Sequence, residues 1–81
     1  TLVIFTADHG DYLGDHWLGE KELFHDTVAA VPLIVRHPGA SARRGVSEPE
    51  LVELIDLLPT FLDAIGAEVP DHLLEGRSLV P

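Results

Sequence analysis

The most constraining feature of the sequence is an abrupt change from apolar to polar residues near its start. Residues 2–5 (LVIF) contain no polar side chain, and Asp8 and His9 follow soon after them. An unbroken apolar run of this kind is typical of a β-strand that is buried on both faces, as in a parallel sheet. Ligands of open α/β sheets bind just beyond the carboxyl ends of such strands. The sequence therefore predicts a strand over 2–7 with a functional site at its end.

Turn and breaker residues divide the next part of the chain into short segments. Three glycines predict a long loop over 8–22, and a loop of this length in a compact domain is usually functional. Helical turns are expected near 11–13 and over 21–26. Prolines enclose a second apolar run, 33–35, which predicts another strand.

The second half of the chain begins less clearly. Residues 40–47 are small and basic and predict an exposed loop. The stretch 47–55 is ambiguous, because a serine and a glutamate three residues apart resemble a capping box, whereas two apolar pairs favour a short strand. From 67 to 81 we expect loop structure with a turn over 75–78.

One helix is predicted between these segments. Asp56 is a suitable N-cap, Pro59 is tolerated in the first turn, and the helix is expected to continue to Ile65. Gly66 supplies a left-handed stop. An apolar stripe at three- and four-residue spacing is predicted to pack in the core, and it consists of Leu58, Phe61, Leu62 and Ile65.

Length and composition favour a portion of a larger domain. The chain has 81 residues, is 46% hydrophobic, starts on Thr1 and contains no Met. A central strand needs neighbours on both sides, so we expect the remainder of a catalytic domain to be its partner and do not expect these residues to fold alone. The sequence does not distinguish a cytoplasmic protein from a periplasmic or secreted one. It also leaves the oligomeric state open, and a homo-oligomer is one of the alternatives.

Charge and residue usage exclude several classes of function. The net charge of −9 argues against a nucleic-acid partner, which requires a basic face. No segment reaches the roughly 18 apolar residues of a membrane span. The absence of cysteine excludes disulfides and thiolate metal sites within these residues.

Asp8 and His9 are the strongest candidates for a metal site. Adjacent residues point to opposite faces of a regular strand, but beyond its end the backbone can turn and aim both at one point. A carboxylate oxygen with an imidazole nitrogen suits Mn, Zn, Mg or, less well, Ca. A bound dication would also reverse the local acidic field and admit an anionic substrate. The spacing alone leaves equally open that Asp8 caps the next turn and that His9 is a hydrogen-bonded polar residue.

Three further side chains could take part in chemistry. Lys21 is either a cation that binds an anionic group and offsets transition-state charge, or a surface lysine paired with Glu20 or Glu22. His16 and His25 are candidates for metal ligands, proton donors or substrate contacts, although single histidines are more often only hydrogen-bonded.

The other polar and aromatic residues of the loop have simpler interpretations. Asp11 and Asp15 are expected to accept backbone hydrogen bonds within the turn. Trp17 is expected to pack against the core, with the wall of a pocket as the alternative. Neither expectation assigns chemistry to these three residues.

Four segments keep the order and spacing of one known family: TADHGDYLGDHWLGEKELFHD, VPLIVRHPG, ELIDLLPTFLDAIG and LEGRSL. Together they resemble the C-terminal part of the sulfatase branch of the alkaline phosphatase superfamily, which includes arylsulfatases and phosphonate monoester hydrolases. The resemblance implies an α/β fold, a large sandwich around a mostly parallel central sheet. Residues 1–81 would form the C-terminal portion of that catalytic domain.

The resemblance also implies roles for individual residues. Asp8 and His9 match the pair that binds one divalent metal ion (Mn, Ca or Zn). Lys21 matches the lysine that contacts the sulfate or phosphate oxygens, and His16 lies where a substrate contact is expected. Many arylsulfatases carry Asn at the position of His9, and imidazole moves the expected metal towards Mn or Zn.

The rest of the implied machinery lies outside these residues or is structural. In this family a formylglycine or a serine attacks sulfur or phosphorus while the metal polarises the ester. That nucleophile and the other metal ligands would lie upstream of residue 1. Asp56 and Pro59 match a structural helix start, and Gly76 and Ser78 match a structural turn.

The resemblance thus implies a hydrolase of small anionic esters. Sulfate esters are the first substrate class, and phosphonate monoesters or phosphodiesters are close competitors. A non-catalytic structural or interaction segment with a decayed site belongs to a different class, and a phosphate-transferring mutase is a weaker alternative.

Overall fold

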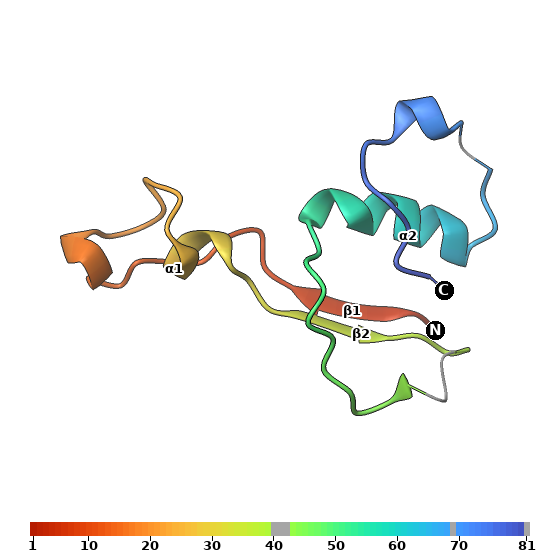
Figure 1. Cartoon of the computed structure of the whole chain (residues 1–81), viewed down its shortest axis with the longest axis horizontal. Helices are drawn as coiled ribbons and strands as arrows, with labels where there is room; N and C mark the ends of the chain where they lie inside the picture. Colours follow the sequence, from red (N-terminus) through yellow and green to blue (C-terminus); the bar gives the residue numbers. More distant parts are fainter. Residues whose placement is uncertain (40–42, 69, 81) are drawn as a thin grey trace. The chain divides into compact units, whose positions relative to one another are not determined.

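The computed structural model describes residues 1–39, 43–68 and 70–80, and the chain forms two compact units, 1–44 and 45–81. The first unit contains a two-stranded sheet and a short helix, and the second contains the longer helix (Figure 1). The α/β character expected from the sequence is therefore confirmed. In the part of the chain that the structure describes, no helix has the length and apolarity needed to cross a membrane.

The two strands of the first unit lie where the sequence predicts them. β1 spans Val3–Thr6 and β2 spans Leu33–Arg36. They pair antiparallel, with Val3 opposite Arg36 and Thr6 opposite Leu33 (Figure 1).

The parallel arrangement expected for β1 does not hold for this pair. The connecting segment folds back on itself, so that β2 returns along β1 in the opposite direction, as in a long hairpin. Both strands are also partly exposed in this chain, with Phe5 61% and Ile34 64% exposed. A mostly parallel sheet can carry an antiparallel strand, so the larger sandwich stays a prediction.

The segment between the strands contains two short helical elements. A 3₁₀ helix, η1, spans Asp15–Trp17, and α1 spans Asp26–Ala29. Helical turns were expected near 11–13 and over 21–26, so each lies further along the chain than predicted. Asp11 explains the first shift, because its Oδ1 accepts a hydrogen bond from the amide of Leu13 (2.8 Å) and holds a turn in place of a helix.

The second unit is built around α2, which spans Leu57–Ala64. The 3₁₀ helix η3 (Leu54–Asp56) leads into it, and a further 3₁₀ turn, η4, spans Asp71–Leu73. The predicted helix is confirmed, and Gly66 follows it with φ 70°, the left-handed conformation expected of a stop residue.

The segments that precede α2 differ in how well they were predicted. Residues 43–47 are exposed, as expected, and 40–42 lie outside the described residues. Neither a helix start at Ser47 nor a short strand forms over the ambiguous stretch. The capping box is found instead at Glu53 and Asp56, where it caps the start of η3.

Asp56 occupies the N-cap position of α2, but its carboxylate does not cap that helix. Oδ2 accepts a hydrogen bond from the amide of Glu53 (3.0 Å), and Oδ1 accepts one from the amide of Arg77 (2.9 Å). These two bonds, the one from Arg77 first, lower the pKa of Asp56 below its ordinary value of 3.8, while burial opposes them. The residue therefore ties the start of the helix to a turn 21 positions later.

Three further contacts complete this connection, which we call the C-terminal clasp (Asp56, Thr60, Asp63 and residues 76–79). Thr60, only 1% exposed, donates its hydroxyl to the carbonyl of Asp56 (2.6 Å) and accepts a bond from the amide of Leu79 (2.9 Å). Ser78 donates to Asp63 Oδ2 (2.6 Å). The turn around Gly76 and Ser78 thus has the structural role that its motif implies.

The predicted apolar stripe of α2 is not buried in this chain. Leu58 is 53% exposed, Phe61 45% and Ile65 78%, whereas the buried residue of the helix is Thr60. The prediction of a core stripe is therefore wrong for the described residues. Leu62, the fourth residue of the stripe, is partly exposed, and the contacts of α2 with the clasp are made by the polar Thr60 and Asp63.

Candidate metal and anion site

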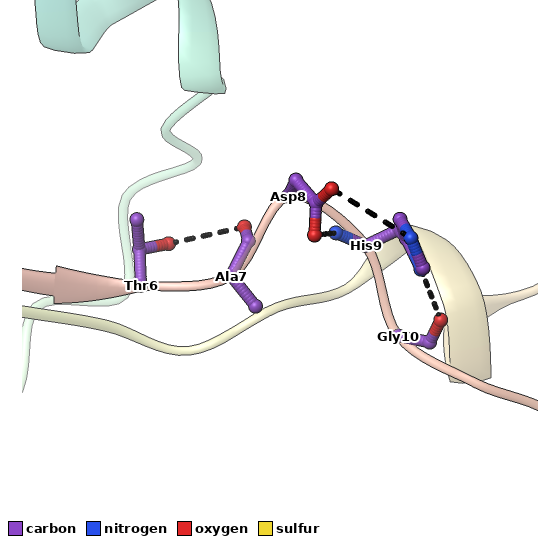
Figure 2. A network of polar contacts seen from close by, with 5 residues as sticks. All are labelled: Thr6, Ala7, Asp8, His9 and Gly10. Carbon is purple, nitrogen blue, oxygen red and sulfur yellow. Dashed lines mark hydrogen bonds and ion pairs between the residues drawn. The ribbon is translucent and has the colours of Figure 1, made fainter.

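Asp8 and His9 lie just beyond β1 and face each other (Figure 2). The Oδ1 atom of Asp8 accepts a hydrogen bond from the backbone amide of His9 (3.0 Å), and its Oδ2 atom lies 3.7 Å from His9 Nε2. The Asp8 side chain is 86% exposed and that of His9 37% exposed. A carboxylate oxygen and an imidazole nitrogen therefore point into the same accessible space at the end of the strand.

The other ring nitrogen of His9 determines what Nε2 can do. Nδ1 lies 2.6 Å from the carbonyl oxygen of Gly10, as the dashed line in Figure 2 shows. A carbonyl oxygen only accepts, so Nδ1 must carry the proton in this contact. In the neutral imidazole, Nε2 then keeps a free lone pair. Histidines that bind metals commonly donate their second nitrogen to a backbone carbonyl in this way.

The distance between the two donor atoms suits a shared cation. Zn–N and Zn–O bonds of about 2.1 Å place two ligands of a tetrahedral ion about 3.4 Å apart. The observed separation of Asp8 Oδ2 and His9 Nε2, 3.7 Å, needs only a small adjustment to reach that value. Over the ranges that the structure describes, no group of three or more His, Cys, Asp or Glu side chains gathers around a common point. Asp8 and His9 would therefore supply two ligands of a larger set.

Gly10, which directly follows Asp8 and His9, contacts α1. Its amide donates a hydrogen bond to the carbonyl of Val28 (2.7 Å), a residue that is 7% exposed. A Cβ at Gly10 would overlap the carbonyl oxygen of Thr27 and lie 3.2 Å from Val28 Cα. Only glycine allows the backbone to approach α1 this closely. Gly10 therefore fixes the position of the chain directly after His9.

Lys21 lies on the opposite arm of the same loop. It is exposed, and within the described residues it forms no ion pair with Glu20, Glu22 or any other acid. Both interpretations of Lys21, the anion-binding cation and the surface lysine, stay predictions. No hydrogen bond or ion pair joins Lys21 to Asp8 or His9 among the described contacts.

His16 lies in a different cluster from the candidate metal ligands. Its ring stacks on that of His25, with centroids 4.1 Å apart and planes at 14°. Tyr12 packs edge-on against both rings and is 2% exposed. Its hydroxyl lies 2.8 Å from His25 Nδ1. We call these three residues the Tyr12 cluster.

The sequence analysis missed Tyr12, which is the largest fully buried side chain among the residues that the structure describes. A signal was available, because Tyr12 is the only tyrosine and a tyrosine buried in a polar loop needs a partner for its hydroxyl. His25, which the sequence left between several roles, is that partner in the structure.

The remaining expectations for the loop divide in two. Asp11 and Asp15 accept backbone hydrogen bonds from Leu13 and His16, as predicted. Trp17 does not pack as expected, since it is 99% exposed. Trp17 has φ of 60°, and the neighbouring residues of η1 are exposed as well.

Comparison with known proteins agrees with the motifs. The family model described as "N-sulphoglucosamine sulphohydrolase, C-terminal" matches residues 14–81. Over 81 residues and the whole chain, identity is 41% to the multifunctional alkaline phosphatase superfamily protein PehA of Trinickia caryophylli and 40% to arylsulfatase K of Canis lupus familiaris. Identity to N-acetylglucosamine-6-O-sulfatase of Bacteroides thetaiotaomicron is 36%, again over the whole chain.

These matches identify both the superfamily and the family of the chain. The chain shares its whole length with hydrolases of the alkaline phosphatase superfamily, of which it spans 16, 15 and 14% in the three relatives named. Within that superfamily, the chain belongs to the sulfatase family and corresponds to its C-terminal region. The family resemblance of the sequence motifs is therefore confirmed.

Proposed function

We propose that the full-length protein hydrolyses sulfate esters with the help of one divalent metal ion. The observation that carries the proposal is the geometry at the end of β1, where a free imidazole nitrogen and a carboxylate oxygen lie 3.7 Å apart. Relatives named as sulfatases that match the whole chain support the sulfate ester as substrate class.

Each residue has a defined task in this proposal. Asp8 and His9 bind the ion, and the Gly10 carbonyl keeps His9 in the tautomer that leaves Nε2 free. When bound, the ion polarises the ester for attack by a nucleophile from another part of the protein. Lys21 donates hydrogen bonds to the sulfate oxygens and offsets the negative charge that grows on them in the transition state. His16 contacts the substrate.

Phosphonate monoester or phosphodiester hydrolysis is the second candidate of the same class. Two observations favour it, namely the imidazole at His9, which suits Mn or Zn, and the 41% identity to a relative whose name states that it is multifunctional. A non-catalytic segment with a decayed site is the alternative of another class, and a mutase is the weakest. The Asp8–His9 geometry, which is suited to a metal, does not favour a decayed site, and the order of the sequence motifs fits a mutase less well.

The metal assignment is tested in the full-length protein with a matched pair of variants. Asp8 and Asp15 are both exposed, each precedes a histidine, and each accepts that histidine's amide through Oδ1. Only Asp8 also faces the ring nitrogen of its histidine. Metal analysis should show a substantial loss for Asp8→Asn and none for Asp15→Asn. Equal metal contents in the two variants would contradict the assignment.

The anion assignment is tested by kinetics. Lys21→Ala should keep the metal and lower kcat/KM by about 10²–10³-fold, the effect of removing one charge-stabilising donor. Comparison of an aryl sulfate with a phosphonate monoester then separates the two substrate classes. Negligible turnover of both by the wild-type protein would reject both hydrolase proposals.

A further inference from the structure

We infer that Tyr12 is a positioning residue for Lys21 and acts through the fold of the loop that carries the lysine. The inference rests on the proposed role of Lys21. It concerns a residue outside the candidate metal pair, and its basis is two contacts of one buried residue: a backbone bond to the arm that carries Lys21 and a side-chain bond to His25.

The main chain of Tyr12 provides the first contact. Its amide donates a hydrogen bond to the carbonyl of Glu20 (2.9 Å), which is the peptide unit immediately before Lys21. The amide of Gly14 donates to the carbonyl of Leu18 (2.9 Å) inside this contact. The arm that leaves the metal pair is thereby joined to the arm that carries the lysine.

The side chain of Tyr12 provides the second contact. Its ring is 2% exposed, and its hydroxyl is bonded to His25 Nδ1 (2.8 Å), directly before α1. The same helix receives the Gly10 amide through Val28. The arm of the loop before Lys21 is therefore attached to α1 and its N-cap at two points, through the Gly10 amide and through the Tyr12 hydroxyl.

The backbone of the loop shows why such attachment is needed. Among the described residues, four other than glycine have positive φ, and all lie between Tyr12 and Lys21: Leu13, His16, Trp17 and Glu20. L-residues adopt this conformation at a cost and keep it only when surrounding contacts impose it. Tyr12 is the buried residue within this segment. The loss of its anchor should let the loop relax and move Lys21.

A double-mutant cycle in the full-length protein tests the inference. Tyr12→Phe keeps the buried ring and removes only the hydroxyl. We expect it to lower kcat/KM for the aryl sulfate by about fivefold to tenfold, the effect of one lost hydrogen bond, with metal content unchanged. In the Lys21→Ala background, where no lysine remains to be positioned, the same change should lower kcat/KM less than about twofold.

A second variant keeps the test independent of any folding defect in the first. His25→Phe retains a ring for His16 to stack on and removes the hydroxyl's partner, so it should give the same Lys21-dependent loss. If either variant lowered kcat/KM by the same factor with and without Lys21, the role would be structural and the inference would be wrong. It would also be wrong if both variants retained wild-type kinetics. Wild-type kinetics for Lys21→Ala itself would instead overturn the proposed function, and this inference with it.

Discussion

Gly76→Ala is the substitution whose effect follows most directly from the coordinates. A Cβ at this position would lie 2.5 Å from the carbonyl carbon of Ile55 and 2.9 Å from the amide nitrogen of Asp56. Carbon atoms in ordinary contact lie about 3.5–4.0 Å apart, so the turn would have to move by about 1 Å. Both obstructing groups are backbone, at the junction of η3 and α2, and cannot rotate out of the way.

The magnitude follows from what that movement disrupts. Overpacking of this kind costs about 1–3 kcal/mol. The turn also carries the amide of Leu79, which donates a hydrogen bond to Thr60 Oγ1 (2.9 Å). The loss of such a bond adds about 1 kcal/mol. We expect the clasp to be weakened by about 3 kcal/mol, which corresponds to about 10²-fold faster exchange of its protected amides.

Hydrogen exchange of the full-length protein, read by mass spectrometry on peptides covering 77–80, measures this effect. Gly66→Ala is the matched control, because Gly66 also lies in the second unit but a Cβ there has no neighbour within 4 Å. Its φ of 70° makes that change cost about 1 kcal/mol at the helix end, and exchange over 77–80 should stay within about threefold of wild type. If the two variants exchanged alike over 77–80, the close approach of Gly76 would not be what holds the clasp.

Three further predictions concern single contacts. Gly10→Ala should reduce metal content without removing a ligand, since its Cβ would overlap the Thr27 carbonyl. Metal analysis measures this effect, with Gly19→Ala as the control, because a Cβ at Gly19 meets nothing within 4 Å. Thr60→Val should destabilise the clasp by about 2 kcal/mol, because the partly buried amide of Leu79 loses its acceptor, whereas Thr60→Ser should not. Urea unfolding compares the two variants. The folded pKa of Asp56 is lowered, so its contribution to stability is complete above about pH 4 and is lost as pH falls through the folded pKa. Asp56→Asn should therefore flatten the acid limb of the unfolding curve below pH 4, and an unchanged limb would contradict the hydrogen-bonded carboxylate.

Local pattern was sufficient for much of this chain. β1, β2 and α2 lie where apolar runs and breaker residues predict them, and Gly66 ends its helix as expected. These features depend on neighbours within a few residues, which the sequence displays directly. The adjacency of Asp8 and His9 at a strand end was visible for the same reason, but the tautomer of His9 required the position of the Gly10 carbonyl.

Tertiary structure decided the features that depend on distant partners. The direction of β2 against β1, the bond from Arg77 to Asp56 and the contact of Tyr12 with His25 all join residues at least 13 positions apart. A carboxylate or hydroxyl can satisfy its hydrogen bonds in many ways, and its own neighbours do not specify which donor the fold will bring within 3 Å. The sequence by itself therefore determined β1, β2, α2 and the candidate metal pair, while only the folded chain determined that Asp56 holds a remote turn and that Tyr12 joins the loop of Lys21 to His25.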